Sequence, residues 1–90
     1  MALSDGTNLL SVWLRLFAVY RERVGQEFIE VSLKPGSTVA EALAFLGELH
    51  PDTLPLMPTS MVAVNREYAD RAHVLQANDE IALIPPVSGG

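Results

Sequence analysis

The sequence predicts an α+β roll, in which one main helix covers one face of a mixed sheet of four to five strands. Apolar and polar residues alternate in two separate stretches, as in strands with one buried face. Only residues 37–51 have the apolar spacing of a substantial helix. Ninety residues of which 49% are hydrophobic suffice for one domain with a single core, so this layered arrangement has enough apolar material.

The first half of the chain predicts two strands around a short helical turn. Residues 18–24 are too charged for a tight turn, and Gly25 follows them as a helix C-cap would. Alternation resumes over residues 27–33 and ends at the turn Lys34-Pro35-Gly36. The first strand is expected at residues 11–17, with Val12, Leu14 and Leu16 on one face and Trp13, Arg15 and Phe17 on the other.

The stretch STVAEALAFLGELHP, residues 37–51, carries the clearest local signature. Thr38 and Glu41 have the spacing of a capping box, and Pro51 limits the C-terminus of the helix. The apolar stripe expected to face the sheet consists of Val39, Ala42, Leu43, Phe45, Leu46 and Leu49.

The second half predicts short strands joined by loops and turns. The proline-rich residues 50–58 are expected to form a loop, and a brief apolar run at residues 73–75 follows the second hairpin. The remaining expected elements are a strand at 61–64, a turn at 65–67, a strand around Tyr68, a turn at 77–79 and a last strand at 80–84.

The domain organisation predicted from these patterns is a flexible N-terminal extension at residues 1–10, a folded domain at 11–85 and a flexible tail at 86–90. Residues 1–8 are polar and lack periodicity. Pro85 and Pro86 have no backbone N–H, so they end the last strand and hold the chain near polyproline II. The tail from Pro85 then extends up to ~20 Å at ~3.1–3.4 Å per residue.

Composition excludes several classes of function. The chain has 11 acidic and 6 basic residues, net −5, which works against binding nucleic-acid phosphates. No cysteine is present, so disulfides, thiolate metal sites and a cysteine nucleophile are excluded. Arg15 interrupts the apolar stretch 9–20, and no basic region precedes it, so we expect a cytoplasmic protein that does not bind membranes.

No side-chain constellation predicts an enzyme. His50 and His73 have no patterned partner, and Ser88 lacks the turn that exposes a serine nucleophile. We therefore expect no catalysis by the chain alone, no metal and no bound cofactor.

The reactive group predicted by the sequence is the carboxylate of Gly90. Gly89 and Gly90 have no side chains, so a partner can enclose them in a narrow channel. A carboxylate is a poor electrophile, whereas an acyl-adenylate formed with ATP is readily attacked.

Residues 12–90 resemble ubiquitin-like β-grasp proteins, and within them the sulfur carriers. Three segments are similar to the family of small, sulfur-carrying subunits of molybdopterin synthase (the MoaD family): LFAVYRERVG at 16–25, AVNREYA at 63–69 and NDEIALIPPVSGG at 78–90. The Pro-Pro-Val-Ser-Gly-Gly ending is the most specific, because Gly-Gly alone also occurs in thiamine-pathway carriers and ubiquitin-like modifiers. The departures are the extra N-terminal residues and Tyr68, a position that is often aliphatic.

The resemblance implies that an ATP-dependent activating enzyme adenylates Gly90, which then becomes a thiocarboxylate. Its sulfur would pass to cyclic pyranopterin monophosphate inside a heterotetramer with the large subunit of molybdopterin synthase. Gly89 would give access to Gly90. The alternatives are a carrier for thiamine, cysteine or tRNA thiolation, a modifier conjugated to lysines, and a binding module with an inert tail.

Partner recognition is expected on the helix-free face of the sheet, at Phe17, Tyr68 and Ile84, although these residues could instead fill a minor core under the loops. The tail residues Pro85, Pro86, Val87 and Ser88 are expected to join this partner-binding surface. Glu67, Asp70, Asp79 and Glu80 predict either a basic partner or a solvated acidic face.

Overall fold

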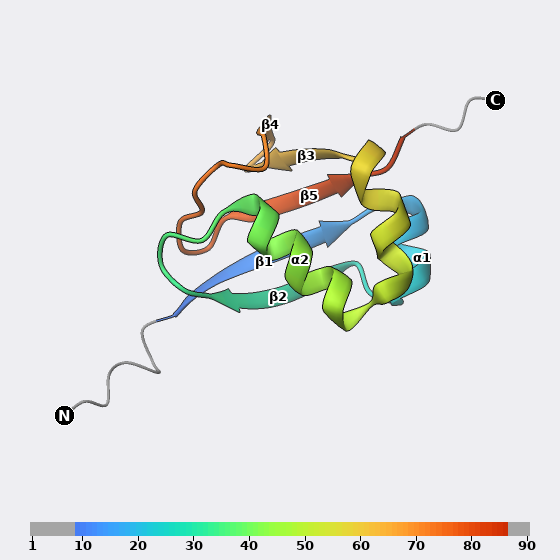
Figure 1. The fold of residues 1–90 in the computed structure, drawn as a ribbon, viewed down its shortest axis with the longest axis horizontal. Coiled ribbons are helices and arrows are strands. Elements are labelled where there is room, and N and C mark those ends of the chain that lie inside the picture. Colours follow the sequence, from blue (N-terminus) through green and yellow to red (C-terminus); the bar gives the residue numbers. More distant parts are fainter. Residues whose placement is uncertain (1–8, 87–90) are drawn as a thin grey trace.

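A computed structural model of the chain describes residues 9–86 and places its main helix on one face of a mixed five-stranded sheet (Figure 1). The α+β roll predicted from the sequence is therefore confirmed. Its elements in order are β1 (Leu10–Leu16), α1 (Ala18–Val24), β2 (Phe28–Leu33), α2 (Val39–Leu49), the 3-10 helix η2 (Pro51–Thr59), β3 (Met61–Val64), β4 (Glu67–Tyr68) and β5 (Glu80–Ile84).

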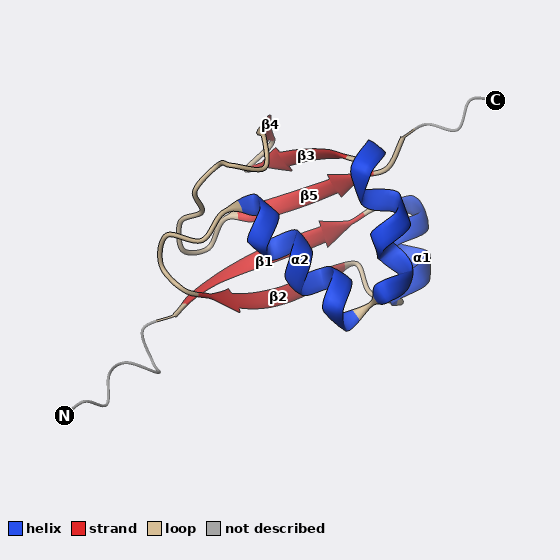
Figure 2. Ribbon diagram, viewed as in Figure 1, coloured by secondary structure: helices blue, strands red, loops and turns tan. Residues whose placement is uncertain are grey.

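The sheet has the strand order β2-β1-β5-β3-β4, so the last strand of the chain lies in its middle. β1 pairs antiparallel with β2 and parallel with β5, while β3 pairs antiparallel with both β5 and β4. Figure 2 shows α2 and η2 in front of these strands and α1 beside their ends, with no helix of residues 9–86 behind them. The opposite face is thus left for other contacts.

The core lies between the sheet and α2. Alternate residues of β1 and β5 are fully buried against the helix, as the period-two pattern predicts. The buried residues of these elements are Val12, Leu14, Leu16, Val39, Ala42, Leu43, Leu46, Ile81 and Leu83. The predicted helical stripe was too wide, because Phe45 and Leu49 are 37% and 53% exposed. The side chains of Leu54 and Met57, in η2, cover α2 at Gly47.

The helix boundaries follow the signals in the sequence. At the start of α2, the backbone N–H of Thr38 donates to Oε1 of Glu41 over 2.8 Å, which confirms the capping box. Gly25 ends α1 with φ +86° and donates its N–H to the carbonyl of Arg21. The first strand ends at Leu16, one residue earlier than predicted, because Phe17 is the N-cap of α1.

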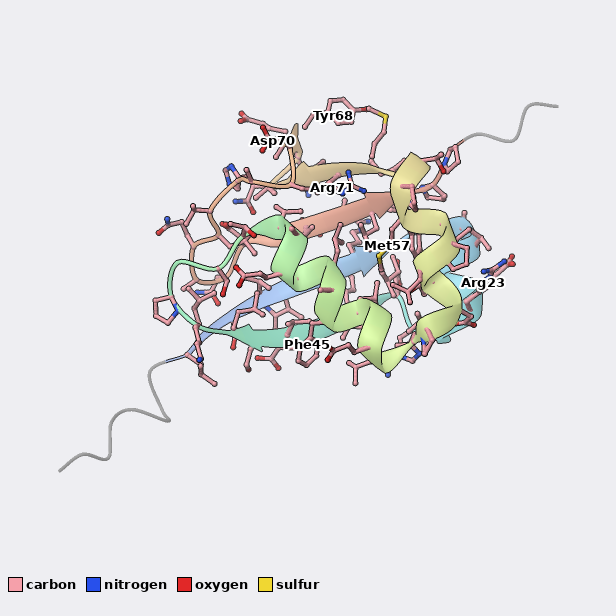
Figure 3. The ribbon with its side chains drawn as sticks, viewed as in Figure 1. Arg23, Phe45, Met57, Tyr68, Asp70 and Arg71 are labelled. Carbon is pink, nitrogen blue, oxygen red and sulfur yellow. The ribbon has the colours of Figure 1, made fainter. Side chains whose placement is uncertain are left out.

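The prediction of a loop at residues 50–58 was wrong, because residues 51–59 form the 3-10 helix η2. Proline lacks the N–H that helical bonding uses, so η2 depends on contacts with other elements. Arg23 donates to the carbonyl of Asp52 and Arg71 donates to that of Met57, each over 2.6 Å. Figure 3 shows these two arginines on either side of η2. The prolines are therefore part of a helix that hydrogen bonds from Arg23 and Arg71 stabilise.

Candidate functional site

One row of residues crosses the helix-free face and takes one member from each strand. The pairing register places Phe28, Arg15, Ala82, Ala63 and Tyr68 side by side, from β2 through β1, β5 and β3 to β4. The middle of the row is two alanines, with longer side chains on both sides. A row with short side chains at its centre leaves a hollow.

That hollow is a pocket of about 270 Å³ on the helix-free face. Its lining residues are Arg15, Phe17, Ala63, Arg66, Tyr68, Glu80, Ala82 and Ile84. The structure therefore brings together Phe17, Tyr68 and Ile84, which were predicted from the sequence to bind partners. Phe17 and Ile84 are half-buried, whereas Tyr68 is 71% exposed.

Arg15 lies between two aromatic rings at the edge of this pocket. Its guanidinium carbon is 5.1 Å from the ring centroid of Phe17 and 5.6 Å from that of Phe28, within the range of cation–π attraction. Nη1 lies 3.5 Å from Oε2 of Glu80. Among the described residues, the buried Nε of Arg15 has no hydrogen-bond acceptor. The aromatic rings thus fix the guanidinium while some of its donors remain unused.

The β3–β4 hairpin places Arg66 at the pocket. Asn65 and Arg66 form its two-residue turn, with φ values of +51° and +74°. Positive φ values at both central positions define a type I′ turn, in which Asn followed by Gly is favoured. The side chain of Asn65 fixes the turn, because Nδ2 donates to Asp79 over 2.8 Å and Oδ1 accepts from the backbone N–H of Glu80 over 3.0 Å.

The predicted tail begins beside this pocket. Ile84, which lines the pocket, ends β5, and Pro85 follows half-buried and Pro86 exposed. The other predicted tail and reactive residues, Val87, Ser88, Gly89 and Gly90, lie outside the described residues.

The acidic surface predicted from Glu67, Asp70, Asp79 and Glu80 is only half present. Asp79 is 7% exposed and accepts hydrogen bonds from Asn65 and Gln76, so it is not a surface residue. Glu80 is paired with Arg15. Glu67 and Asp70 are exposed and line a second hollow of about 550 Å³, next to Tyr68 (Figure 3). Of these four acidic residues, only Glu80 lines the pocket.

Residues 9–86 contain no group of three or more His, Asp or Glu side chains placed to hold a metal ion. Within the same range, no helix has the length and apolar composition needed to cross a bilayer.

Sequence reasoning missed Arg15 and Arg66 as members of the site. The alternation placed Arg15 on the correct face of its strand. The contacts of its guanidinium with aromatic rings depend on which strands pair, and alternation does not predict that pairing. For Arg66, the signal was the pair Asn-Arg at the centre of a two-residue turn, where glycine is usual.

Several known proteins are similar to this chain over nearly its whole length. The molybdopterin synthase sulfur carrier subunit of Arabidopsis thaliana is 33% identical over 87 residues, covering 97% of this chain and 91% of that protein. The protein of the same name from Dictyostelium discoideum is 38% identical over 78 residues, covering 83% and 91%.

The fold has a close counterpart in the crystal structure of SAMP1 from Haloferax volcanii. The TM-score is 0.81 with 33% identity, covering 89% of this chain and 99% of that one. A more distant neighbour with the same fold is the ubiquitin of Caldiarchaeum subterraneum, with a TM-score of 0.61 and 15% identity, so the roll is a ubiquitin-like β-grasp. The ThiS family matches residues 14–90, a range that includes the pocket and the Pro-Pro-Val-Ser-Gly-Gly motif. The chain therefore belongs to the ThiS family, and its relatives include sulfur carrier subunits with the ubiquitin-like β-grasp fold.

Proposed function

We propose that this protein carries sulfur on the carboxyl group of Gly90 during the biosynthesis of molybdopterin. The main support is the identity of 33% and 38% with two molybdopterin synthase sulfur carrier subunits, together with a family match that extends through Gly90. Gly89 and Gly90 offer no side chain that would hinder an enclosing partner.

The proposed chemistry has three balanced steps. The Gly90 carboxylate attacks the α-phosphorus of ATP, giving an acyl-adenylate and pyrophosphate. A sulfide or persulfide donor then displaces AMP and leaves a thiocarboxylate, with a reductant releasing the product where the donor is a persulfide. The thiocarboxylate sulfur finally attacks a carbon of cyclic pyranopterin monophosphate and displaces an oxygen substituent from it, and water then cleaves the resulting acyl–sulfur bond, which leaves the sulfur on the pterin and restores the carboxylate.

The folded domain supplies recognition in this proposal, and its partners supply catalysis. An ATP-dependent activating enzyme binds the nucleotide, and the large subunit of molybdopterin synthase binds the pterin, in the cytoplasm and in a heterotetramer. The pocket lined by Phe17, Tyr68 and Ile84 lies beside Pro85, where the tail leaves the sheet. The proposal is that this one surface docks on each partner in turn while Gly90 enters the partner's active site.

Intact mass spectrometry tests this function directly. The protein is incubated with its cognate activating enzyme, ATP and a sulfur source, and its mass is expected to rise by one exchange of oxygen for sulfur. A matched variant with one alanine added after Gly90 should show no rise. An unchanged mass of the wild-type chain, with an activating enzyme that is competent on another carrier, would contradict the proposal.

A second candidate function is that of a protein modifier. Small archaeal modifier protein 1 of Haloferax volcanii is 36% identical over 84 residues, which favours this alternative. The activated Gly90 would then be attacked by a lysine amine, and an isopeptide would form as AMP leaves. Digestion of cell extracts and a search for peptides that carry the Gly90 remnant on lysine separates the two functions, because a dedicated sulfur carrier leaves no such remnant.

A further inference from the structure

We infer that the pocket on the helix-free face receives a carboxylate side chain of a partner protein, held between Arg15 and Arg66. This inference rests on the proposed function, which brings that face against the large subunit of molybdopterin synthase. The inferred partner group is negatively charged. The net charge of the chain alone would instead indicate a positively charged partner.

The charge lining the pocket differs from that of the protein as a whole. The chain carries a net charge of −5, yet the pocket is lined by two arginines and a single carboxylate, Glu80. The two exposed acids nearby, Glu67 and Asp70, line a different hollow. A partner that docks here therefore meets a local excess of positive charge within an acidic surface, and charge complementarity favours an acidic residue.

Arg15 is prepared to bind such a group. The rings of Phe17 and Phe28 hold its guanidinium, so little side-chain entropy remains to be lost on binding. Its contact with Glu80 is long, at 3.5 Å, and its buried Nε lacks an acceptor among residues 9–86. Docking removes water from the remaining donors, and an unpaired buried donor is costly, so the partner must supply an acceptor.

Arg66 supports the inference independently. Its φ of +74° is one that side chains other than glycine adopt at a cost, in a turn where glycine is favoured. No hydrogen bond or ion pair of its side chain is found in the described part of the chain, although the residue lines the pocket. A strained residue whose side chain bonds no group among residues 9–86 is explained by a contact with a partner.

The pocket also fits the aliphatic part of an acidic side chain. Ala63 and Ala82 provide an apolar floor between the arginines and Tyr68, and Ile84 adds an apolar wall. The methylene groups of Glu or Asp can pack there while the carboxylate reaches the arginines. The volume of about 270 Å³ is suited to one side chain with its neighbours.

Equilibrium binding to the large subunit tests the inference with matched charge changes. Arg15→Gln and Arg66→Gln should each weaken binding about tenfold or more, the loss expected for a hydrogen bond to a charged group. Lys34→Gln removes the same charge in the exposed turn after β2, at the other end of the sheet, and should leave affinity unchanged. Equal affinities of all four proteins would overturn the inference.

Two further variants separate partner binding from a purely structural role. Glu80→Gln removes the carboxylate that competes for Arg15 and should tighten binding, whereas a structural Arg15–Glu80 pair predicts that this change and Arg15→Gln both weaken it. Arg66→Gly relieves the strained turn, so it should weaken binding without lowering the melting temperature. Parallel losses of affinity and melting temperature in these two variants would contradict the inference.

Carbodiimide cross-linking identifies the group that enters the pocket. The reagent joins an amine to a nearby carboxylate as an amide, with loss of water, and Lys34 is the single lysine of the sequence. The amine introduced by Arg66→Lys should cross-link to an Asp or Glu of the large subunit, located by peptide mass spectrometry. A cross-link to Gly90 or to a second copy of this chain instead would overturn the inference.

The outcomes distinguish this inference from the function on which it rests. A wild-type chain that gains sulfur and binds the large subunit, with Arg15→Gln and Arg66→Gln binding equally well, retains the function and overturns the inference. A wild-type chain that neither gains sulfur nor binds the large subunit overturns both.

Discussion

The phenolic oxygen of Tyr20 lies 2.7 Å from Oγ of Ser60 inside the protein, where Tyr20 is completely buried. Ser60 uses its one hydroxyl proton to donate to the carbonyl of Leu56, also over 2.7 Å, so Tyr20 is the donor to Ser60. This chain of two hydrogen bonds ties α1 to the end of η2.

Tyr20→Phe should lower the free energy of unfolding by about 1 kcal/mol, the typical loss for one neutral hydrogen bond. Denaturation by urea, followed by circular dichroism, measures the change. Tyr68→Phe is the matched control, since Tyr68 is 71% exposed and should unfold as the wild type does. Equal losses in both variants would show that the Tyr20–Ser60 bond contributes nothing.

Ser60→Ala should be more damaging than Tyr20→Phe, by roughly 1 kcal/mol, because it leaves one buried and one partly buried polar group without partners. These groups are the Tyr20 hydroxyl and the carbonyl of Leu56. A double variant that combines both changes restores apolar contact at Tyr20 and should lose less than the sum of the single losses. Strict additivity would argue against the proton assignment.

Gly47→Ala should stabilise the protein more in a Leu54→Ala background than in the wild type. Alanine raises helix propensity by about 1 kcal/mol, but a Cβ at Gly47 would clash with the side chain of Leu54, with Cγ at 3.1 Å. In the wild type these effects oppose each other. In a Leu54→Ala background the clash is gone, and Gly47→Ala should stabilise by about 0.5–1 kcal/mol. Thermal unfolding of the four proteins measures this coupling, and identical effects in both backgrounds would disprove it.

Asn65→Ala should cost about 2–3 kcal/mol, because it removes the side-chain bonds to Asp79 and to the N–H of Glu80 and places alanine at a positive φ. Asn78→Ala is the control, because Asn78 also has a positive φ and makes no side-chain hydrogen bond within residues 9–86. Its expected cost is about 1 kcal/mol, from backbone strain alone. Chemical denaturation with equal losses in the two variants would remove the role given to the Asn65 side chain.

Phe17→Ala should weaken binding to the large subunit and to the activating enzyme by roughly 1–3 kcal/mol each, as for a central interface residue. Phe28→Ala is the matched variant, since Phe28 also contacts Arg15 but does not line the pocket, and its effect should be smaller. Calorimetric titration measures both. If Phe17→Ala instead melts far below the parent and binds normally once folded, Phe17 is a core residue.

The parts of the fold that sequence predicts well are those with local causes. Thr38 and Glu41 cap α2 through atoms three residues apart, and the alternation in β1 and β5 follows from burial of one face. The choice of Phe17, Tyr68 and Ile84 as neighbours also needed only face assignment and the fold class. Their role in recognition stays a prediction.

The parts that sequence could not supply depend on contacts between distant residues. The prolines of residues 51–59 indicated a loop because nothing local shows that Arg23 and Arg71 bond the carbonyls of η2. Asp79 was expected at the surface because its bond to Asn65 spans fourteen positions. The pocket itself requires the pairing of Ala63 with Ala82, which fixes the short side chains at its floor.

The central position of β5 has a mechanical consequence for the tail that follows it. Residues 80–84 are bonded to β1 on one side and to β3 on the other. A force that pulls Pro86 along the strand axis loads both ladders in shear at the same time, and no single bond can open first, as it would at the edge of a sheet. A partner protein or an unfolding enzyme that pulls on the tail therefore applies its force to the strand of the domain that most resists unfolding.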